Sequence, residues 1–526
     1  NRLVIDIAIK EGNQYRIGEV VIEGSKAFSE AELLKKIPLK RGNVASSELL
    51  RHAEQQIIDS YAGKGYIDTS VRPVYDGDPS RGILNVKYIV EEGKIAYIRN
   101  IFIQGNERTK DKVIRREILV RPGDTLDSTK IRRSQRILEN LGYFASVRSR
   151  ILDTPVADEK DVVFEVEEKE TGMLSGGASF SEIDRLMGYI QISQGNFDIT
   201  GWPYFTGGGQ KLKLDASVGS RRTRYDISFT EPWFCDQPLA LGIDFYRSTI
   251  DQRDYDVKRT GGMVSISKRL SSANKVRIAY KIEKTDITHV ADTNEYFYVD
   301  NPAESYFFPR GQQTLKSGVE VAFIHDTRDH PFIPTRGTRA MLRGETTGGP
   351  LGGDTDLYNI EAEGSLYFPL YFGHVLSMYA RYEVVDCYGD TENVPIDDLL
   401  FAGGGRTIRG FKYRHVGPKV FREIKSSTGE TSKYIRPVGG KSLALGKIEY
   451  TIPLPGPFRA GLFSDAGNVW RDSFEFEPSD VAISAGIGIR IDIPFFPLRL
   501  DWARPVRKDH ETTATDVFSF WIGYSY

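Results

Sequence analysis

The chain has 526 residues, which is too long for one ordinary domain and enough for about three. Its 70 basic and 72 acidic residues nearly cancel, so it lacks the basic excess of nucleic-acid-binding proteins, and we expect no nucleic-acid partner. No apolar run approaches the roughly 20 residues of a membrane helix, but β-barrels cross membranes with alternating segments whose individual signal is weak.

The N-terminal third contains an internal repeat with a period of about 80 residues, which is the size of a small domain rather than of a solenoid unit. Each copy has the pattern strand, helix, helix, strand, strand, and we place the two domains at residues 13–91 and 92–170. The matching segments are 11–12, 15–17, 20–24 and 65–67 in the first copy, and 92–93, 97–99, 101–105 and 142–144 in the second.

Helix signals in the first copy support this pattern. Ser29 and Glu32 have the spacing of a capping box, which predicts that a helix begins there. A second helix is predicted by apolar residues at helical spacing, namely Leu50, Ala53, Ile57 and Tyr61.

The closing strand of each copy ends in an acidic segment, at residues 86–92 and 162–168. Residues 3–12 resemble this closing strand without the domain that precedes it. We therefore interpret residues 1–12 as the remnant of an upstream copy, which makes the chain a truncated protein.

From residue 171 onward the helical period gives way to alternation with period two, which predicts a 16-stranded antiparallel transmembrane β-barrel over residues 171–526. A soluble β-sandwich or propeller is the alternative. Against it, Phe518, Phe520, Ile522, Tyr524 and Tyr526 share one face of the last segment, which would promote aggregation in water but suits lipid. The expected strands lie near 171–181, 186–195, 209–219, 223–231, 239–249, 258–270, 273–285, 314–326, 336–347, 355–368, 373–386, 441–451, 457–465, 481–493, 497–504 and 517–526.

A long turn-rich segment, residues 388–440, interrupts this alternation and contains three glycines followed by Arg406-Thr407-Ile408-Arg409-Gly410-Phe411. A flexible surface loop is one interpretation. Strand parity, however, places Glu449 and Asp465 on the inner face of adjacent strands. These carboxylates either line a wet channel or hold the loop through Arg409, because a guanidinium can bind two carboxylates in fixed geometry.

These features together resemble the superfamily of outer-membrane assembly and transport proteins that combine POTRA repeats with a β-barrel, and within it the central subunits of the bacterial β-barrel assembly machine. The motifs that carry the resemblance are Ile408-Arg409-Gly410-Phe411, the strand motif 463–467 that receives this loop, and the acidic position Glu449. The N-terminal repeats resemble POTRA domains. One departure is the segment 202–207, which is longer than the family's usual turn.

The resemblance implies a bacterial outer-membrane location with the POTRA domains in the periplasm. It implies unfolded outer-membrane proteins as clients, lipoprotein subunits and the lipid bilayer as partners, and neither enzymatic activity nor a cofactor. It also implies a lateral seam between the first and last strands, where Gly172, Gly176 and Gly177 leave few side chains to pack and Phe518, Phe520 and Tyr526 face lipid.

Two related transport functions remain as alternatives, two-partner secretion and a translocation-assembly role. An outer-membrane hydrolase is disfavoured because the histidines are scattered and the segment 325–330 lacks metal-ligand spacing.

Two structural expectations follow from the predicted barrel. Cys235 and Cys387 belong to turns on opposite sides of the membrane and should not pair. Arg409 should lie inside the barrel, bonded to Asp465 and Glu449, with Phe411 packed against the inner wall.

Overall fold

The computed structural model describes residues 14–156, 158–181, 185–252, 255–290, 294–308, 311–425, 431–492, 498–512 and 515–522. The chain divides into two compact units, Asn1–Thr171 with Gly195–Gly209, and Gly172–Gln194 with Gln210–Tyr526. The strand remnant expected at residues 1–12 lies outside the described residues.

The first unit contains two copies of the predicted βααββ pattern. In each copy the first and last strands pair in parallel, the last two pair antiparallel, and the last strand is central, so the orders are β1-β3-β2 and β4-β6-β5. The first copy consists of β1 (Arg16–Glu23), α1 (Glu30–Lys36), α2 (Ser47–Ala62), β2 (Ser70–Asp78) and β3 (Ile83–Glu91). The second consists of β4 (Tyr97–Gln104), α3 (Asp111–Arg115), α4 (Ser128–Asn140), β5 (Phe144–Asp153) and β6 (Glu159–Glu168).

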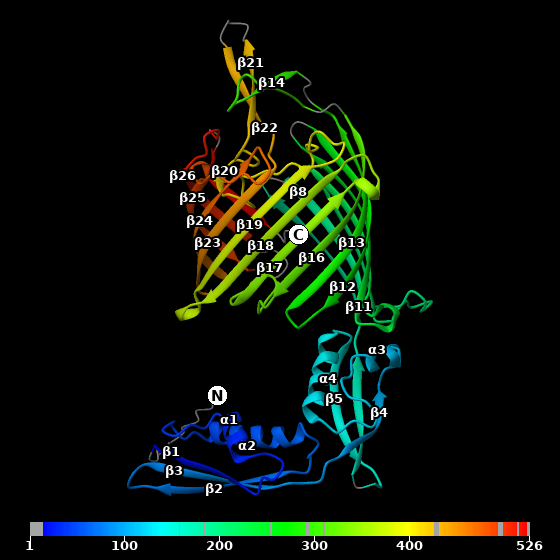
Figure 1. Cartoon of the computed structure of the whole chain (residues 1–526), viewed down its shortest axis with the longest axis vertical. Coiled ribbons are helices and arrows are strands. Elements are labelled where there is room, and N and C mark those ends of the chain that lie inside the picture. Colours follow the sequence, from blue (N-terminus) through cyan, green and yellow to red (C-terminus); the bar gives the residue numbers. More distant parts are fainter. Residues whose placement is uncertain are drawn as a thin grey trace, which may run out of the picture. The chain divides into compact units, whose positions relative to one another are not determined.

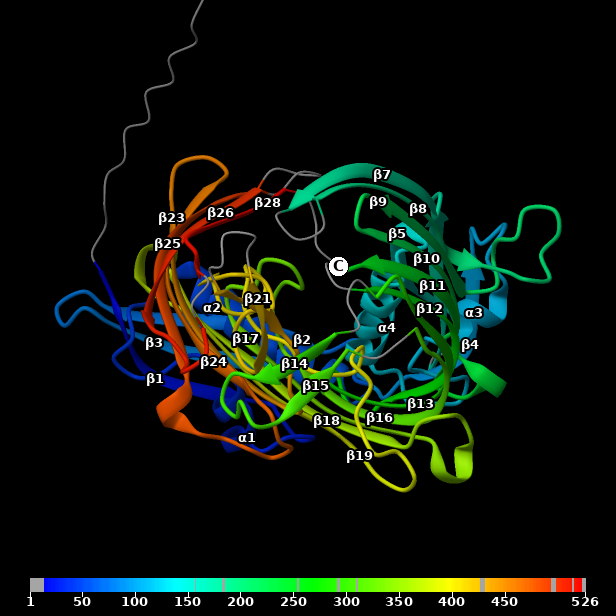
Figure 2. The same cartoon turned by 90° about the horizontal axis from the view of Figure 1, so that it is seen from above.

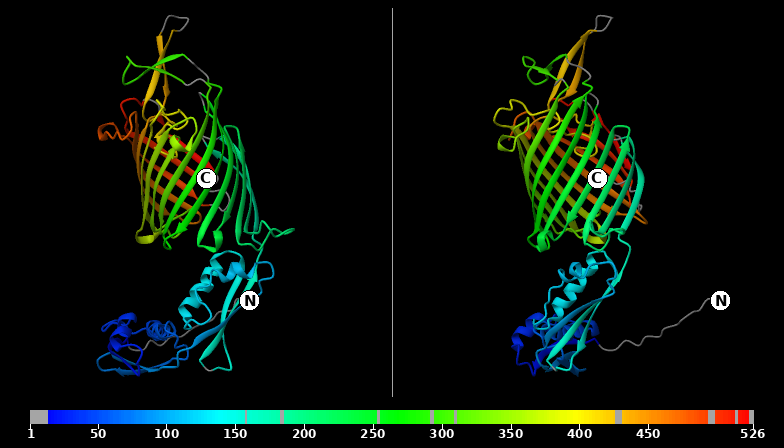
Figure 3. Two further views of the ribbon diagram at one scale, coloured as in Figure 1. Left: turned by 45° about the vertical axis from the view of Figure 1, so that its right-hand side comes forward. Right: turned by 90° about the vertical axis from the view of Figure 1, so that its right-hand side faces the viewer.

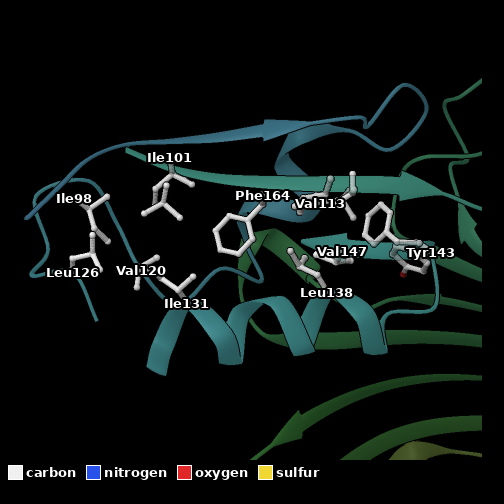
Figure 4. Close-up of a cluster of buried hydrophobic side chains, with 14 of the residues drawn as sticks. Ile98, Ile101, Val113, Val120, Leu126, Ile131, Leu138, Tyr143, Val147 and Phe164 are labelled. Atoms are coloured by element: carbon white, nitrogen blue, oxygen red, sulfur yellow. The ribbon is translucent and has the colours of Figure 1, made fainter. Parts of the chain in front are cut away.

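The sequence signals explain these local structures. Ser29 and Glu32 form the predicted capping box at the start of α1. Gly24 and Gly105, which match each other in the repeat, both have φ of +86°, and a side chain there would collide with a carbonyl oxygen of the neighbouring strand. Helix and sheet enclose an apolar core in each copy, and Figure 4 shows that of the second, in which Phe164 points from β6 toward α4.

A glutamate in the acidic segment after each closing strand accepts hydrogen bonds from backbone amides in both copies of the repeat. Glu92 accepts hydrogen bonds from the amides of Lys26 and Ala27 and from the Tyr61 hydroxyl, at 2.6, 2.7 and 2.8 Å. In the second copy Glu168 likewise accepts from the two amides that precede α3. Each closing strand is thereby joined to the loop before the first helix.

The second unit is a closed barrel of sixteen strands, which confirms the predicted fold class (Figures 1–3). Every predicted segment overlaps one of these strands. They are β7 (Gly172–Ser181), β8 (Arg185–Phe197), β9 (Gln210–Gly219), β10 (Arg222–Glu231), β11 (Leu239–Asp251), β12 (Asp256–Arg269), β13 (Asn274–Thr288), β16 (Gln313–Asp326), β17 (Gly337–Thr347), β18 (Leu357–Pro369), β19 (Val375–Cys387), β23 (Ser442–Pro453), β24 (Phe458–Trp470), β25 (Ala482–Ile491), β26 (Leu498–Arg507) and β28 (Phe518–Ile522).

The long segment 388–440 is folded inward only in part, which corrects the prediction. Residues 419–437 form the hairpin of β21 (Lys419–Lys425) and β22 (Thr431–Pro437). Its strand β21 pairs with β14 (Glu295–Tyr298), which in turn pairs with β15 (Ser305–Phe307), in a four-stranded sheet at one end of the barrel (Figure 1). Aromatic residues of two separate loops hold it there, because Tyr296 is fully buried and Phe297 packs near Phe421.

Three further observations bear on the predicted organisation. Cys235 and Cys387 are both free, as expected. In the described part of the chain, no helix is long and apolar enough to span a bilayer. Residues Gly195–Gly209, placed within the barrel by the sequence analysis, group with the first unit.

The carboxylate of Glu92 gives a test of the repeat's stability. Burial by itself raises the pKa of this carboxyl, but the amides of Ala27 and Lys26 and the Tyr61 hydroxyl outweigh burial and hold the pKa below its usual value. A depressed folded-state pKa contributes stability that is complete above the unfolded pKa of about 4.3 and is lost as the pH falls through the folded pKa.

Glu92→Gln should therefore lower the free energy of unfolding at neutral pH by about 1.5 kcal/mol and weaken the dependence of that free energy on pH. Urea unfolding of the two repeats at neutral and acidic pH measures both effects, and Glu91→Gln, an exposed neighbour, is the control. Equal urea midpoints for the two variants would contradict the expectation.

Candidate functional site

The loop after β19 places one arginine against the inner wall of the barrel. Arg409 is only 2% exposed, and its Nε and Nη2 donate to the two oxygens of Asp465 on β24, both at 2.6 Å. Its backbone amide donates to the same carboxylate at 3.0 Å, and its Nη1 donates to Glu449 on β23 at 2.9 Å. The structure thus brings Arg409 together with both carboxylates that strand parity assigned to the inner face.

The contact belongs to a larger network that spans four consecutive strands. Glu449 also accepts from Arg490 on β25 at 2.9 Å and from Arg499 on β26 at 3.2 Å. Asp501 on β26 lies 2.7 Å from Arg490 and 2.8 Å from Arg499. Three guanidinium groups therefore meet three carboxylates, so the buried charges balance within the network.

Aromatic and backbone contacts fix the loop around this network. The guanidinium carbon of Arg409 lies 3.3 Å from the ring centroid of Phe463, the first residue of the receiving strand motif. Lys447 on β23 donates to the carbonyl oxygen of Arg406 at 2.6 Å. Gly410 has φ of +86°, and a Cβ there would lie 3.2 Å from that of Ala503 on β26, so this position favours glycine.

Phe411 anchors the apolar part of the loop. It is fully buried in a cluster with Ile408, Leu443 and Val469, as the sequence analysis expected for a ring packed on the inner wall. The loop therefore presents a charged side chain to one part of the wall and an apolar side chain to the next.

The same loop is bonded to the segment that leads into the last barrel strand. Gly410 and Phe411 form β20 and pair with Asp516 and Thr515 of β27. Further along, the backbone amide of Gly417 donates to Asp509 and that of Lys419 donates to Glu511, each at 2.8 Å. The hydroxyl of Thr512 donates to the carbonyl oxygen of His415 at 2.6 Å. Burial, together with nearby carboxylates and against the opposing effect of Lys419, raises the pKa of Glu511 to about 7.

A second anchor lies on another part of the wall and was missed from the sequence. Lys316 on β16 donates to Asp397 at 2.8 Å and to Asp398 at 2.6 Å, and Arg259 on β12 donates to the carbonyl oxygen of Asp397 at 2.7 Å. Sequence parity could place Lys316 on an inner face, but nothing in the loop marks Asp397 as its partner. Arg499 and Asp501 were missed in the same way, although their strand was predicted.

The two strands assigned to the seam, β28 and β7, are neighbours in the closed barrel (Figure 2). Among the described residues, the two strands are paired at Trp521 with Ser181 and at Ile522 with Phe180. Phe520 stacks on Phe180 across this boundary, and Phe518 is exposed on the outer face. Tyr526 lies outside the described residues.

The three glycines predicted for the seam differ in how closely other atoms surround them. A Cβ built on Gly172 would meet a single neighbouring atom within 4 Å, at 3.9 Å, whereas one on Gly177 would collide with the ring of Tyr189 at 2.9 Å. Gly176 lies between them and approaches the backbone of β8.

Comparison with known proteins gives matches over nearly the whole chain. A model of the Omp85 superfamily domain matches residues 205–526, and a POTRA model, described as a surface antigen variable number repeat, matches residues 15–93 and 96–169. Outer membrane protein assembly factor BamA of Nitratidesulfovibrio vulgaris is 26% identical over 516 residues, with 97% of this chain and 62% of the relative covered. The protein of the same name from Neisseria meningitidis serogroup B is 26% identical over 574 residues, with 99% and 68% covered. The chain thus spans about two thirds of the length of these curated relatives.

Solved structures show the same fold. BamA from Haemophilus ducreyi lacking POTRA domains 1–3 is similar with a TM-score of 0.75 and 23% identity, over 97% of this chain and 100% of that one. CdiB from Acinetobacter baumannii is similar with a TM-score of 0.52 and 15% identity, over 100% of this chain and 93% of that one.

Replacing Arg409 tests whether its contacts act as a latch on the loop. Arg409→Ala leaves Asp465 buried without its cation, and we expect a loss of about 3 kcal/mol, the lower end for a buried ion pair because the lumen admits water. Arg409→Lys should recover little, because an ammonium cannot bind both carboxylates in fixed geometry. Thermal unfolding of the barrel and limited proteolysis within residues 403–418 measure the effect.

The control is Lys412→Ala, which removes an exposed cation from the same loop. If Arg409→Lys matches the unmodified protein, or if Lys412→Ala loosens the loop equally, the contact is not a latch.

Proposed function

Because this chain belongs to the Omp85 superfamily, we propose that it folds β-barrel proteins and inserts them into the bacterial outer membrane through the seam between β7 and β28. Its own barrel is an outer-membrane barrel with POTRA repeats. The clients would be unfolded outer-membrane proteins, and lipoprotein subunits would assist on the periplasmic side. The reaction needs no covalent step, because burying lipid-facing surface and pairing backbone groups supply the free energy.

The observation that carries the proposal is the difference in described strand pairing between the seam and a pair of strands elsewhere in the wall. In the described residues β28 pairs with β7 at two positions near one end, whereas β25 and β24 pair from Phe458 opposite Ile491 to Gly467 opposite Ala482. Opening the seam exposes unpaired amides and carbonyls within the bilayer. A client strand can satisfy these groups by adding to the edge.

The loop has a definite part in this proposal. It is fixed to the wall by Arg409, and through Gly410 and Phe411 it pairs with the segment immediately before β28. A loop held in this way positions the start of the last strand while the rest of that strand remains free to separate from β7. The loop would therefore limit how far the seam opens.

The POTRA repeats offer a second place for client strands. The central strand of each sheet is the closing one, so β2 and β5 are edge strands. Such edges can accept an extended segment by main-chain pairing. We propose that they receive clients before the seam does.

Two-partner secretion and a translocation-assembly role are the alternatives in the same superfamily. A secretion route through the lumen would require the loop to leave the buried Arg409 site and the Lys316 anchor. Insertion at the seam leaves both in place, which favours assembly.

A disulfide across the seam tests the proposal in a background of Cys235→Ser and Cys387→Ser. Ser181→Cys with Trp521→Cys joins a paired position of β7 and β28, and the oxidised protein should lose client insertion into lipid vesicles while the reduced protein retains it. The matched control joins β10 and β11 through Ile227→Cys and Phe245→Cys, also a paired position, where oxidation should change nothing. Full activity of the oxidised seam variant would exclude opening of the seam as the mechanism. Unimpaired export of one dedicated protein, without client insertion, would favour the transport alternatives.

A further inference from the structure

The connection between β8 and β9 displays large apolar side chains to the surroundings. Trp202 is 80% exposed, Tyr204 83% and Ile199 60%. Soluble surfaces do carry single exposed apolar residues, but a cluster of this kind in one short loop marks a contact with a membrane or another molecule. Residues 199–206, which we term the aromatic loop, contain no charged residue.

Hydrogen bonds and an ion pair of Asp198 hold the start of the aromatic loop. Asp198, whose side chain is buried, accepts from the amide and hydroxyl of Thr200 at 3.0 and 2.7 Å, and forms an ion pair of 2.6 Å with Lys110. Phe205 donates its amide to the carbonyl oxygen of Gly201 and packs against Trp202. The exposed rings therefore belong to a turn whose backbone is fixed by hydrogen bonds.

Hydrogen bonds of the flanking residues also join the aromatic loop to the second POTRA repeat. Asn196 donates to the hydroxyl of Thr109 at 2.9 Å and accepts from the amide of Gly209 at 2.8 Å. The amide of Lys110 donates to the carbonyl oxygen of Gly207, whose φ of +104° and close approach to Arg108 leave no room for a side chain. These contacts tie the loop to the residues that precede α3.

The covalent connection keeps the aromatic loop close to the ends of two barrel strands. It joins Phe197, which ends one barrel strand, to Gln210, which begins the next. Trp202 is only a few residues from a strand end, so it lies within about 17 Å of that end even in a fully extended chain. The headgroup layer, roughly 5–8 Å deep on each side, is within this reach.

Other hairpin turns of the barrel that strand alternation assigns to the same membrane side also carry exposed aromatic residues. The turn between β18 and β19 exposes Tyr371 and Phe372, and that between β16 and β17 exposes Phe332. Tryptophan and tyrosine favour the membrane interface because their rings are apolar while their N–H and O–H groups can bond to headgroups and water. A protein-binding site would be expected to add charged groups such as arginine to its aromatic residues.

We propose that the aromatic loop inserts Trp202 and Tyr204 into the phospholipid interface and so anchors the second POTRA repeat at the membrane surface through Asp198 and Asn196. The ligand is the boundary between headgroups and acyl chains of the bilayer. This role is independent of what the barrel assembles.

The experiment uses the full chain in phospholipid vesicles and measures quenching of tryptophan fluorescence. The fluorescence emission of Trp202 is obtained by subtracting the emission of the Trp202→Phe variant from that of the unmodified protein. Lipids brominated near the headgroup end of the acyl chains should quench roughly half of this emission, while aqueous iodide should quench little of it. Tyr204→Trp in the Trp202→Phe background provides a second reporter at the other exposed ring, should Trp202→Phe alter the loop.

A matched control places the reporter on the same unit away from the aromatic loop. Tyr75→Trp, on the edge strand β2 in the Trp202→Phe background, should be quenched by iodide and not by brominated lipid. Quenching of Trp202 by iodide alone would overturn the proposal. Protection of Trp202 from iodide without quenching by brominated lipid would also overturn it, because the loop would then be covered by protein.

Discussion

A buried arginine inside a membrane barrel must be matched by carboxylates, and this requirement organises the wall around the inward loop. Arg409 is paired with Asp465 and Glu449, and the remaining charge of Glu449 is met by Arg490 and Arg499. Removing Arg409 leaves Asp465 buried without its cation, while the other ion pairs join strands β23, β25 and β26 to one another.

The charge network lies close to the strands that close the barrel. The network lies on β23–β26, and the next strand, β28, has few described pairs to β7. The loop connects the network to the segment before β28, because it is bonded to the wall at Arg409 and to Asp509, Glu511 and β27. The segment that leads into the last barrel strand is therefore held by the same loop that binds the wall through Arg409.

The outer surface follows a different constraint, since lipid requires apolar side chains where the lumen requires charges. Ile487 and Ile489 are exposed on the face of β25 opposite to Arg490. At the ends of the strands the same surface becomes aromatic, which suits the interface between lipid and water. Trp202 is likewise exposed, on a loop that belongs to the first unit.

The repeats, the sixteen barrel strands and the contact of Arg409 with Asp465 and Glu449 could be predicted from the sequence. These features follow from periods of 3.6 and 2, from glycine positions and from strand parity, all of which are local properties of the chain. Three features could not be predicted: Arg499 and Asp501 complete the network, Lys316 binds Asp397, and β21 and β22 join β14 and β15 in one sheet. The physical reason is that such contacts join segments far apart in sequence, and which of many inward-facing charges meet depends on strand register and on the path of each loop.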